Sequence, residues 1–241
     1  MTPEEVKELT AAVEGWLTEP EGELLFRLAS QCTGRGVIVE IGSWKGKSTI
    51  WLAMGLENSA AAKQTKIFAI DPHSGSSEHQ EMYGEVRTFE EFKANIANAQ
   101  INHLIVPLVK ASEQAADEMD QAVELVFIDG AHEYEFVKLD FELWFPKVID
   151  GGIMAFHDTT LWPGPKRVVR DLVFKSRRFR RSGFIHSITF AQKVERNSLF
   201  DCIRNRYILF LKNTNELVGK LHIPKLIRTI GRRILRFIQG I

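Results

Sequence analysis

The fold depends on the stretch Val37-Ile38-Val39-Glu40-Ile41-Gly42-Ser43-Trp44-Lys45-Gly46-Lys47-Ser48. Its first five residues are nearly all apolar, which is typical of a strand buried on both faces. Gly42 and Gly46 then mark a turn, and a helical pattern begins at Lys47. Glycine permits positive φ and close backbone approach, so this order of elements indicates a ligand-binding loop. A plain tight turn between a strand and a helix is the alternative.

The glycine turn differs from two common nucleotide-binding motifs. It lacks the third glycine of G-x-G-x-x-G, which disfavours a nicotinamide dehydrogenase. The interval from Gly42 to Gly46 is one residue too short for G-x-x-x-x-G-K-[ST], although Gly46-Lys47-Ser48 resembles the end of that motif.

The same alternation of strand and helix continues along the chain. After 37–41, short apolar runs predict strands at 67–70, 104–106, 125–128 and 153–156. Between them, helices are expected at 47–56, 88–99, 112–119 and 133–145, with Thr88 and Glu91 as a capping box. A helix at 166–175 and strands at 184–190 and 207–211 complete seven strands. This pattern predicts an α/β fold with a doubly wound parallel sheet.

Two helices and a basic tail flank this region. The first helix is expected from Thr2-Pro3 to about Leu17, and the second from about Gly22 to Cys32. The predicted organisation is therefore N-terminal helices over 1–34, a central domain over 35–213 and a basic amphipathic tail over 214–241.

Composition excludes several classes of protein. The chain has 241 residues, of which 44% are hydrophobic and 26% are charged, so disordered and disulfide-scaffold proteins are excluded. Cys32 and Cys202 lie far apart and lack metal-ligand spacing, which fits a reducing, cytoplasmic compartment. We expect neither a signal peptide nor a membrane-spanning segment.

Charge is divided unevenly along the chain. Residues 1–160 hold 12 Lys+Arg and 27 Asp+Glu, whereas 161–241 hold 19 and 4. Five cations fall within 175–181, and 217–241 combine six cations with apolar residues at helical spacing after Pro224. We expect an amphipathic helix that lies on an anionic membrane, or that packs on its own domain or across a homodimer. Nucleic-acid binding is the weaker interpretation.

The carboxyl ends of parallel strands are where ligands bind in an open sheet. Asp71 follows the second strand at the place where ribose hydroxyls would be held, although Asp before Pro is also a common turn. Ser112 and Glu113 follow the third strand, where Ser112 is alternatively an N-cap.

Three potential metal ligands follow the next two strands. Asp129 ends one strand and His157-Asp158 end the other, so neighbouring strands would bring them together. Two carboxylates and an imidazole in one place need a proton or a cation between them, and magnesium or manganese fits. His132 lies three residues beyond Asp129 and is placed to accept a proton. Helix capping by the acidic strand ends is the alternative.

Taken together, these segments resemble class I S-adenosylmethionine-dependent methyltransferases, within the bacterial branch related to macrolide-sugar and catechol O-methyltransferases. The resemblance covers about residues 20–212 and is carried by 39–48, 69–75, 127–134, Gly151-Gly152 and 156–158. It implies a Rossmann-like sheet of order 3-2-1-4-5-7-6 with the last strand antiparallel. It also makes 35–213 the cofactor-binding methyltransferase domain.

The resemblance also implies roles for single residues. The methionine part of the cofactor would contact Glu40, Gly42, Ser43 and Gly46. The ribose of the cofactor would contact Asp71, and the adenine would contact Ser112 and Glu113. Asp129, His157 and Asp158 would hold a divalent metal, with Asp129 also near the cofactor, and His132 would be the general base. Metal-dependent members often carry Asp or Glu where this chain has His157.

The predicted function is O-methyl transfer from S-adenosylmethionine, assisted by magnesium or manganese, to a hydroxyl of a small molecule or a sugar or glycan intermediate. The alternatives are a metal-independent methyltransferase with His132 or His157 as the sole base, and a non-catalytic cofactor-binding protein that docks through its basic tail. Residues 74–87 are expected to contribute to acceptor choice.

Overall fold

The computed structural model describes residues 1–75 and 85–219. Their strands form one seven-stranded sheet in the order β3-β2-β1-β4-β5-β7-β6. The strands are β1 (Val37–Ile41), β2 (Ile67–Ile70), β3 (Ile105–Leu108), β4 (Val123–Ile128), β5 (Val148–Phe156), β6 (Phe179–Ile185) and β7 (Ile188–Lys193). Strand β7 is antiparallel to both β5 and β6, whereas β1 to β5 pair in parallel. The expected strand order and the antiparallel last strand are both confirmed.

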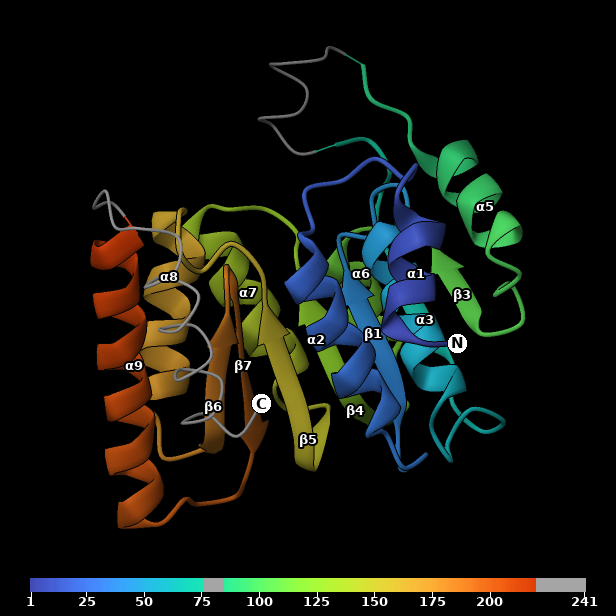
Figure 1. Ribbon diagram of the computed structural model, residues 1–241. Coiled ribbons are helices and arrows are strands. Elements are labelled where there is room, and N and C mark those ends of the chain that lie inside the picture. Colours follow the sequence, from blue (N-terminus) through green and yellow to red (C-terminus); the bar gives the residue numbers. More distant parts are fainter. Residues whose placement is uncertain (76–84, 220–241) are drawn as a thin grey trace.

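Helices cover both faces of this sheet (Figure 1). One face packs against α1 (Pro3–Thr10), α2 (Glu19–Ser30), α3 (Lys47–Glu57) and α5 (Phe89–Asn98). The other packs against α6 (Ser112–Glu118), α7 (Tyr134–Trp144), α8 (Pro163–Val168), its π-helical continuation η1 (Val169–Phe174) and α9 (Leu199–Gly219). Adjacent residues of β1 point to opposite faces of the sheet. Ile38 packs in the hydrophobic core on the side of α1, α2, α3 and α5, and Val39 packs in the core on the other side.

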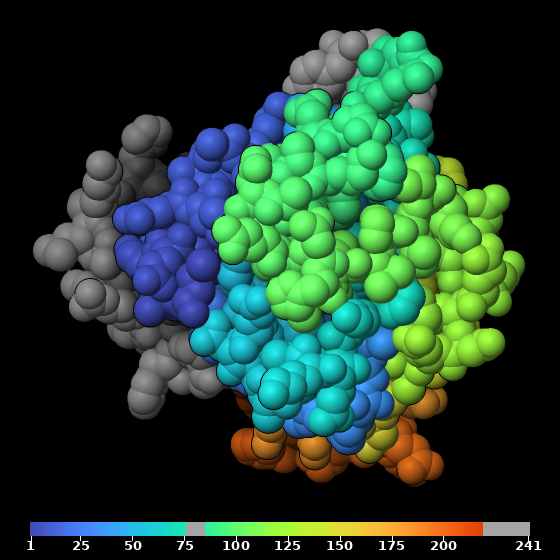
Figure 2. All heavy atoms as spheres, turned by 90° about the vertical axis from the view of Figure 1, so that its right-hand side faces the viewer, coloured from blue at the N-terminus to red at the C-terminus, as the bar shows by residue number. Residues whose placement is uncertain are grey.

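The first helices belong to the same body as the sheet. Figure 2 shows the N-terminal segment, α3 and α5 forming one continuous surface over a flank of the molecule. Helix α1 begins at a capping box, in which the Thr2 amide donates to Glu5 Oε2 at 2.7 Å. It ends at Thr10, so the prediction of a helix to about Leu17 is wrong. Gly15 interrupts the helical pattern, and residues 14–17 line a cavity instead.

Two other expectations on helix starts are also corrected. Helix α2 begins at Glu19 rather than Gly22, because Thr18 caps it and Pro20 occupies its first turn. Thr88 does not form the expected capping box, since its hydroxyl pairs with His73 Nδ1 at 2.9 Å.

The C-terminal third departs furthest from the sequence prediction. Residues 184–190, expected as one strand, span the end of β6, its turn and the start of β7. Residues 207–211, expected as a strand, lie inside α9, because a short apolar run does not distinguish a strand from a buried helical turn. Helix α9 continues past residue 214, and the helix expected after Pro224 lies outside the described residues. No described helix is long and apolar enough to cross a membrane.

Helices α2 and α3 approach each other closely through a glycine. A Cβ on Gly55 would lie 2.2 Å from the Phe26 carbonyl oxygen of α2. Through this contact, α2 packs directly on α3.

We predict that Gly55→Ala destabilises the protein by about 2 kcal/mol or more because the added methyl forces α2 and α3 apart. At a helical position where nothing contacts the added methyl, Gly→Ala would stabilise the protein by about 1 kcal/mol. The direction of the change in stability therefore shows whether the two helices are in close contact. Thermal unfolding followed by circular dichroism tests this, and an unchanged or raised Tm would contradict the close packing.

Candidate functional site

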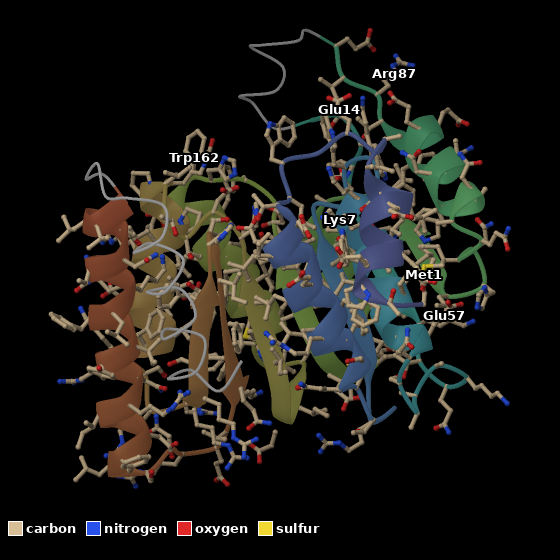
Figure 3. The ribbon with its side chains drawn as sticks, viewed as in Figure 1. Met1, Lys7, Glu14, Glu57, Arg87 and Trp162 are labelled. Carbon is tan, nitrogen blue, oxygen red and sulfur yellow. The ribbon has the colours of Figure 1, made fainter. Side chains whose placement is uncertain are left out.

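A cavity of about 1190 Å³ opens at the carboxyl ends of the parallel strands. Its lining includes residues that directly follow β2, β4 and β5, namely Asp71, Asp129 and His157. Glu14 and Trp162 also line it, and both lie at the same end of the molecule in Figure 3. The cavity therefore occupies the position where open α/β sheets bind ligands.

The glycine loop forms one wall of this cavity. Gly42 has φ 86°, and a Cβ there would lie 2.0 Å from the Asp129 carbonyl oxygen, so only glycine fits. The neighbouring Ser43 is buried, lines the cavity, and its hydroxyl has no hydrogen-bond partner among the described residues. Gly46 lies outside the lining and its Cα faces Phe92 and Ile96. The Ser43 hydroxyl is therefore available to a ligand, and it lies next to Gly42, whose backbone approaches the end of β4 closely.

The carboxylate of Asp71 organises this loop from the next strand. Its Oδ2 accepts a hydrogen bond from the Trp44 amide at 2.7 Å, and its Oδ1 accepts one from the His73 amide at 2.6 Å. Trp44 and His73 both have positive φ, of 46° and 55°. Each carboxylate oxygen retains a second lone pair, so Asp71 can also accept a hydrogen bond from a ligand hydroxyl.

Ser112 and Glu113 line the far side of the cavity at the start of α6. Ala111, rather than Ser112, is the N-cap. Ser112 Oγ accepts a hydrogen bond from Trp144 Nε1 at 2.8 Å. Burial raises the pKa of the nearby Asp140 to about 6, although a hydrogen bond with Ser112 lowers it. Asp140 lines the same wall and was missed in the sequence.

Glu40 lies beneath the cavity rather than in its lining. Its side chain is fully buried, and its Oε2 accepts a hydrogen bond from Thr49 Oγ1 at 2.5 Å. Burial raises the pKa of this carboxyl from 4.5 to about 7, against hydrogen bonds from Ser48 and Thr49.

Asp129, His157 and Asp158 converge in the lining of the cavity, where one possible ligand atom from each lies within 4.8 Å of the others. His157 Nδ1 is 3.0 Å from Asp129 Oδ1 and 3.1 Å from Asp158 Oδ2. Burial would lower the pKa of His157, but Asp129 and the other carboxylates around it raise the pKa well above its ordinary value. The three side chains that sequence placed at two strand ends are therefore brought together.

Glu21 is the member of this cluster that the sequence did not identify. Its Oε2 lies 3.6 Å from His157 Nε2, on the opposite side of the ring from the two aspartates. Its Oε1 accepts hydrogen bonds from the Ser187 amide and hydroxyl at 2.8 and 2.6 Å. Burial would raise the pKa of Glu21, yet the contact with His157 lowers it to about 2. Thr18 and Glu21 form the capping box of α2, a local motif that does not indicate the approach of Glu21 to His157.

The donor set fits a divalent cation. Asp129, His157 and Asp158 offer two carboxylates and one imidazole nitrogen, a set that suits manganese and also admits magnesium or zinc. A metal-binding histidine usually donates its second ring N–H to a carboxylate, and Glu21 lies on that side of His157. Without a cation, a protonated His157 links the two aspartates.

His132 lies beside this cluster. Its Nε2 is 3.0 Å from Asp158 Oδ2, and its ring stacks on Trp162 with centroids 4.3 Å apart. Burial would raise the pKa of Asp158, but hydrogen bonds with His132 and His157 hold it well below its usual range. Asp158 is therefore ionised and accepts the hydrogen bond, so His132 Nε2 is the donor.

Large apolar side chains surround the mouth of the cavity. Trp16, Phe136 and Leu161 are 56%, 55% and 80% exposed, and all three line it. They come from the segment after α1, from α7 and from the loop after β5. The polar cluster is thus reached through an apolar entrance, which the sequence did not indicate because the three segments are far apart.

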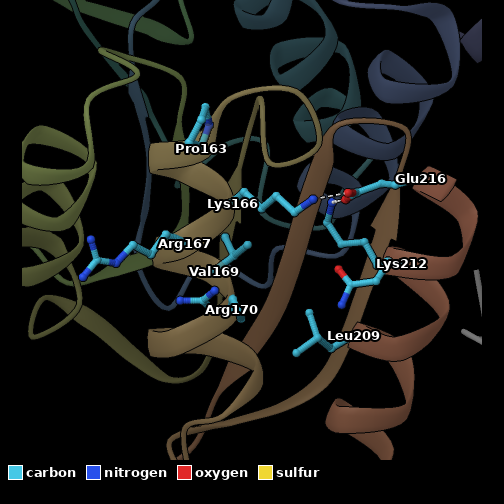
Figure 4. A pocket seen from close by; sticks show the side chains of 9 residues that line it. Pro163, Lys166, Arg167, Val169, Arg170, Leu209, Lys212 and Glu216 are labelled. Atoms are coloured by element: carbon cyan, nitrogen blue, oxygen red, sulfur yellow. Dashed lines mark hydrogen bonds and ion pairs between the residues drawn. The ribbon is translucent and has the colours of Figure 1, made fainter. Parts of the chain in front are cut away.

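A smaller cavity of about 320 Å³ lies between α8 and α9 (Figure 4). Lys166 and Lys212 both pair with Glu216, and Lys166 and Glu216 line the large cavity as well. The buried Lys212 also donates to the Thr159 carbonyl at 2.8 Å. These contacts connect α9 to the loop that carries Asp158.

Comparisons with known proteins agree with this architecture. A family model described as a methyltransferase domain matches residues 39–159. The uncharacterized protein y4gI of Sinorhizobium fredii is 34% identical over 123 residues, which are 51% of this chain but only 13% of y4gI. The chain therefore spans a small part of that relative.

Solved structures of O-methyltransferases share the fold. NovP has a TM-score of 0.65 at 17% identity, and the match covers 80% of this chain and 89% of NovP. TomG from Streptomyces achromogenes, solved in complex with SAM, has a TM-score of 0.57 at 18% identity, with the same coverage of both chains. At these identities the likeness is one of fold.

The buried Glu40 predicts a pH dependence of stability. The folded protein keeps the Glu40 proton up to about pH 7, whereas an unfolded chain releases it near 4.5, so the folded state binds more protons in that interval. This group therefore makes the free energy of unfolding fall as pH rises from about 4.5 to about 7.

We predict that Glu40→Gln removes this dependence. The Tm of the variant minus the Tm of the unsubstituted protein should therefore be larger at pH 8 than at pH 5. Thermal unfolding at both pH values measures the difference, with the exposed Glu90→Gln as the matched control. If this difference in Tm is the same at pH 5 and pH 8, Glu40 is not protonated in the folded state.

Proposed function

The chain belongs to the methyltransferase domain family, and on that premise we propose that it transfers the methyl group of S-adenosylmethionine to a hydroxyl. The acceptor that we propose is a small molecule or a sugar or glycan intermediate. The observation that carries this proposal is the convergence of Asp129, His157, Asp158 and His132 in the same cavity as the glycine loop.

The cofactor would bind across the carboxyl ends of β1, β2 and β3. Gly42 lets the loop lie against Asp129, and the unpartnered Ser43 hydroxyl can hydrogen-bond the methionine part. Asp71 can accept from the ribose hydroxyls, while Ser112 and Glu113 lie where the adenine would reach α6. Holding the donor in one orientation matters because methyl transfer needs oxygen, carbon and sulfur in line.

Asp129, His157 and Asp158 would hold the metal, and magnesium or manganese bound there would supply a Lewis acid that lowers the pKa of the acceptor hydroxyl. Glu21 keeps His157 oriented from the opposite side of the ring. The apolar entrance formed by Trp16, Phe136 and Leu161 reduces water around the hydroxyl.

His132 is the proposed general base. Its Nε2–H donates to Asp158, so the acceptor proton would pass to Nδ1. The ionised Asp158 then stabilises the imidazolium that forms, and the stacked Trp162 holds the ring in place.

A second candidate is a metal-independent methyltransferase with His132 as the sole base. The geometry that supports it is the contact of His157 Nδ1 with Asp129 Oδ1 and Asp158 Oδ2, because a protonated His157 would itself balance the two carboxylates. In that case the same residues orient the acceptor by hydrogen bonds alone.

We predict micromolar binding of S-adenosylmethionine by calorimetry, and a loss of at least about tenfold in Gly42→Ala, because the new Cβ would push the loop away from Asp129. Gly34→Ala is the matched control, since Gly34 also has positive φ (85°) but lies outside the cavity lining, and a Cβ there would meet nothing closer than 3.4 Å. Absence of any cofactor binding by the unsubstituted protein would refute the proposed function.

We predict that His132→Ala lowers kcat for methyl transfer by about 100-fold or more and changes cofactor affinity by less than about threefold. Formation of S-adenosylhomocysteine with a panel of vicinal diols and catechols provides the assay. EDTA should abolish turnover, and added Mn²⁺ or Mg²⁺ should restore it. Turnover that survives EDTA would favour the metal-independent candidate, and full activity of His132→Ala would exclude this base.

A further inference from the structure

Helix α9 carries a row of exposed apolar side chains on its outer face. Six large residues on one side of the helix are between 48% and 75% exposed. They are the adjacent pair Leu199 and Phe200, followed at intervals of three, four, three and seven residues by Ile203, Tyr207, Phe210 and Leu217. We call these six residues the α9 stripe. Figure 1 shows α9 at the outer edge of the molecule, beyond α8 and β6.

The opposite face of α9 already anchors the helix to the sheet. Asn205 donates to the Phe179 carbonyl at 2.8 Å and accepts a hydrogen bond from the Ser182 hydroxyl at 2.7 Å. Ile208 is completely buried, and Lys212 is 2% exposed. Packing of α9 on its own domain therefore buries the inner face of the helix, but it does not explain why the outer face carries the apolar residues of the α9 stripe.

Exposed cations lie on α9 and on the neighbouring strand. Arg206 is the one exposed charged residue on the described length of α9, and Arg181 is exposed on β6, which packs against α9. Within residues 161–219 there are 13 Lys+Arg and 4 Asp+Glu. An apolar row on a helix, with exposed cations on and near that helix, is typical of a helix that lies in a membrane interface.

We propose that the α9 stripe docks on an anionic phospholipid bilayer. With 21 residues, α9 is about 30 Å long and would lie in the plane of the interface, with its apolar side chains among the acyl chains and its arginines at the phosphates. This surface is independent of the cavity and so goes beyond the proposed function.

Charge favours an anionic bilayer over two other partners for the α9 stripe, namely residues 220–241 and a second copy of the chain. Residues 220–241 contain six Lys+Arg and no Asp+Glu, so that segment would be repelled by the exposed arginines on and near α9. A second copy that placed its own stripe there would bring the same cations with it. An anionic surface attracts all of these groups at once.

Vesicle flotation with the chain of residues 1–241 tests the proposal. We expect binding to vesicles of phosphatidylcholine with 30% phosphatidylglycerol, and at least tenfold weaker binding to phosphatidylcholine alone or in 0.5 M NaCl. The double variant Ile203→Glu/Phe210→Glu should lose at least tenfold in binding. Ile203→Ser/Phe210→Ser, which adds no negative charge, should lose at least threefold.

Val109→Glu is the matched control, because Val109 is 49% exposed at the end of β3, on the opposite edge of the sheet. It should bind vesicles as the unsubstituted protein does, and all variants should keep their Tm because the changed residues are exposed. No vesicle binding, or equal binding by the two stripe variants and the control, would overturn the proposal. A stripe variant that turns a dimer into a monomer in sedimentation would assign the stripe to a second copy and would also overturn it.

Discussion

The structure depends on the ring of His157 and the carboxylates on either side of it. Nδ1 contacts Asp129 and Asp158, while Nε2 faces Glu21 at 3.6 Å. These residues come from the ends of β4 and β5 and from the first turn of α2, so one imidazole joins the sheet to the N-terminal helices. Three acids around one ring need a proton or a metal, and this requirement is the chemical property on which the proposed reaction rests.

The register of the sheet couples this cluster to the glycine loop. The Asp129 amide donates to the Ile41 carbonyl at 2.8 Å, and the His157 amide donates to the Ile128 carbonyl at 3.0 Å, so the parallel pairing continues past the strand ends. Because a Cβ on Gly42 would collide with the Asp129 carbonyl, the glycine loop and the acidic cluster touch through backbone atoms. A methyl donor on the loop and an acceptor at the cluster would therefore lie side by side.

Sequence alone predicted the elements whose position follows from strand pairing. The family resemblance implied that the strands ending in Asp129 and in His157-Asp158 are neighbours, and their side chains do meet. Glu21 escaped prediction because a capping box locates a helix start but not the surface on which the helix docks. Residues 207–211 were misassigned because five apolar residues carry no clear period, whereas the buried Asn205, Ile208 and Lys212 follow the period of a helix. The roles assigned to the site residues, in cofactor binding, metal binding and catalysis alike, stay predictions.

The most direct test of the central claim is to locate a metal in the cluster. Crystals of the protein grown with Mn²⁺ and S-adenosylhomocysteine should show an anomalous difference peak bounded by Asp129 Oδ1, His157 Nδ1 and Asp158 Oδ2, with each donor about 2.0 to 2.3 Å away. The peak should be lost in Asp129→Asn. An empty cluster at millimolar Mn²⁺, with His157 still in contact with both aspartates, would contradict the metal site and leave the imidazolium as the cation there.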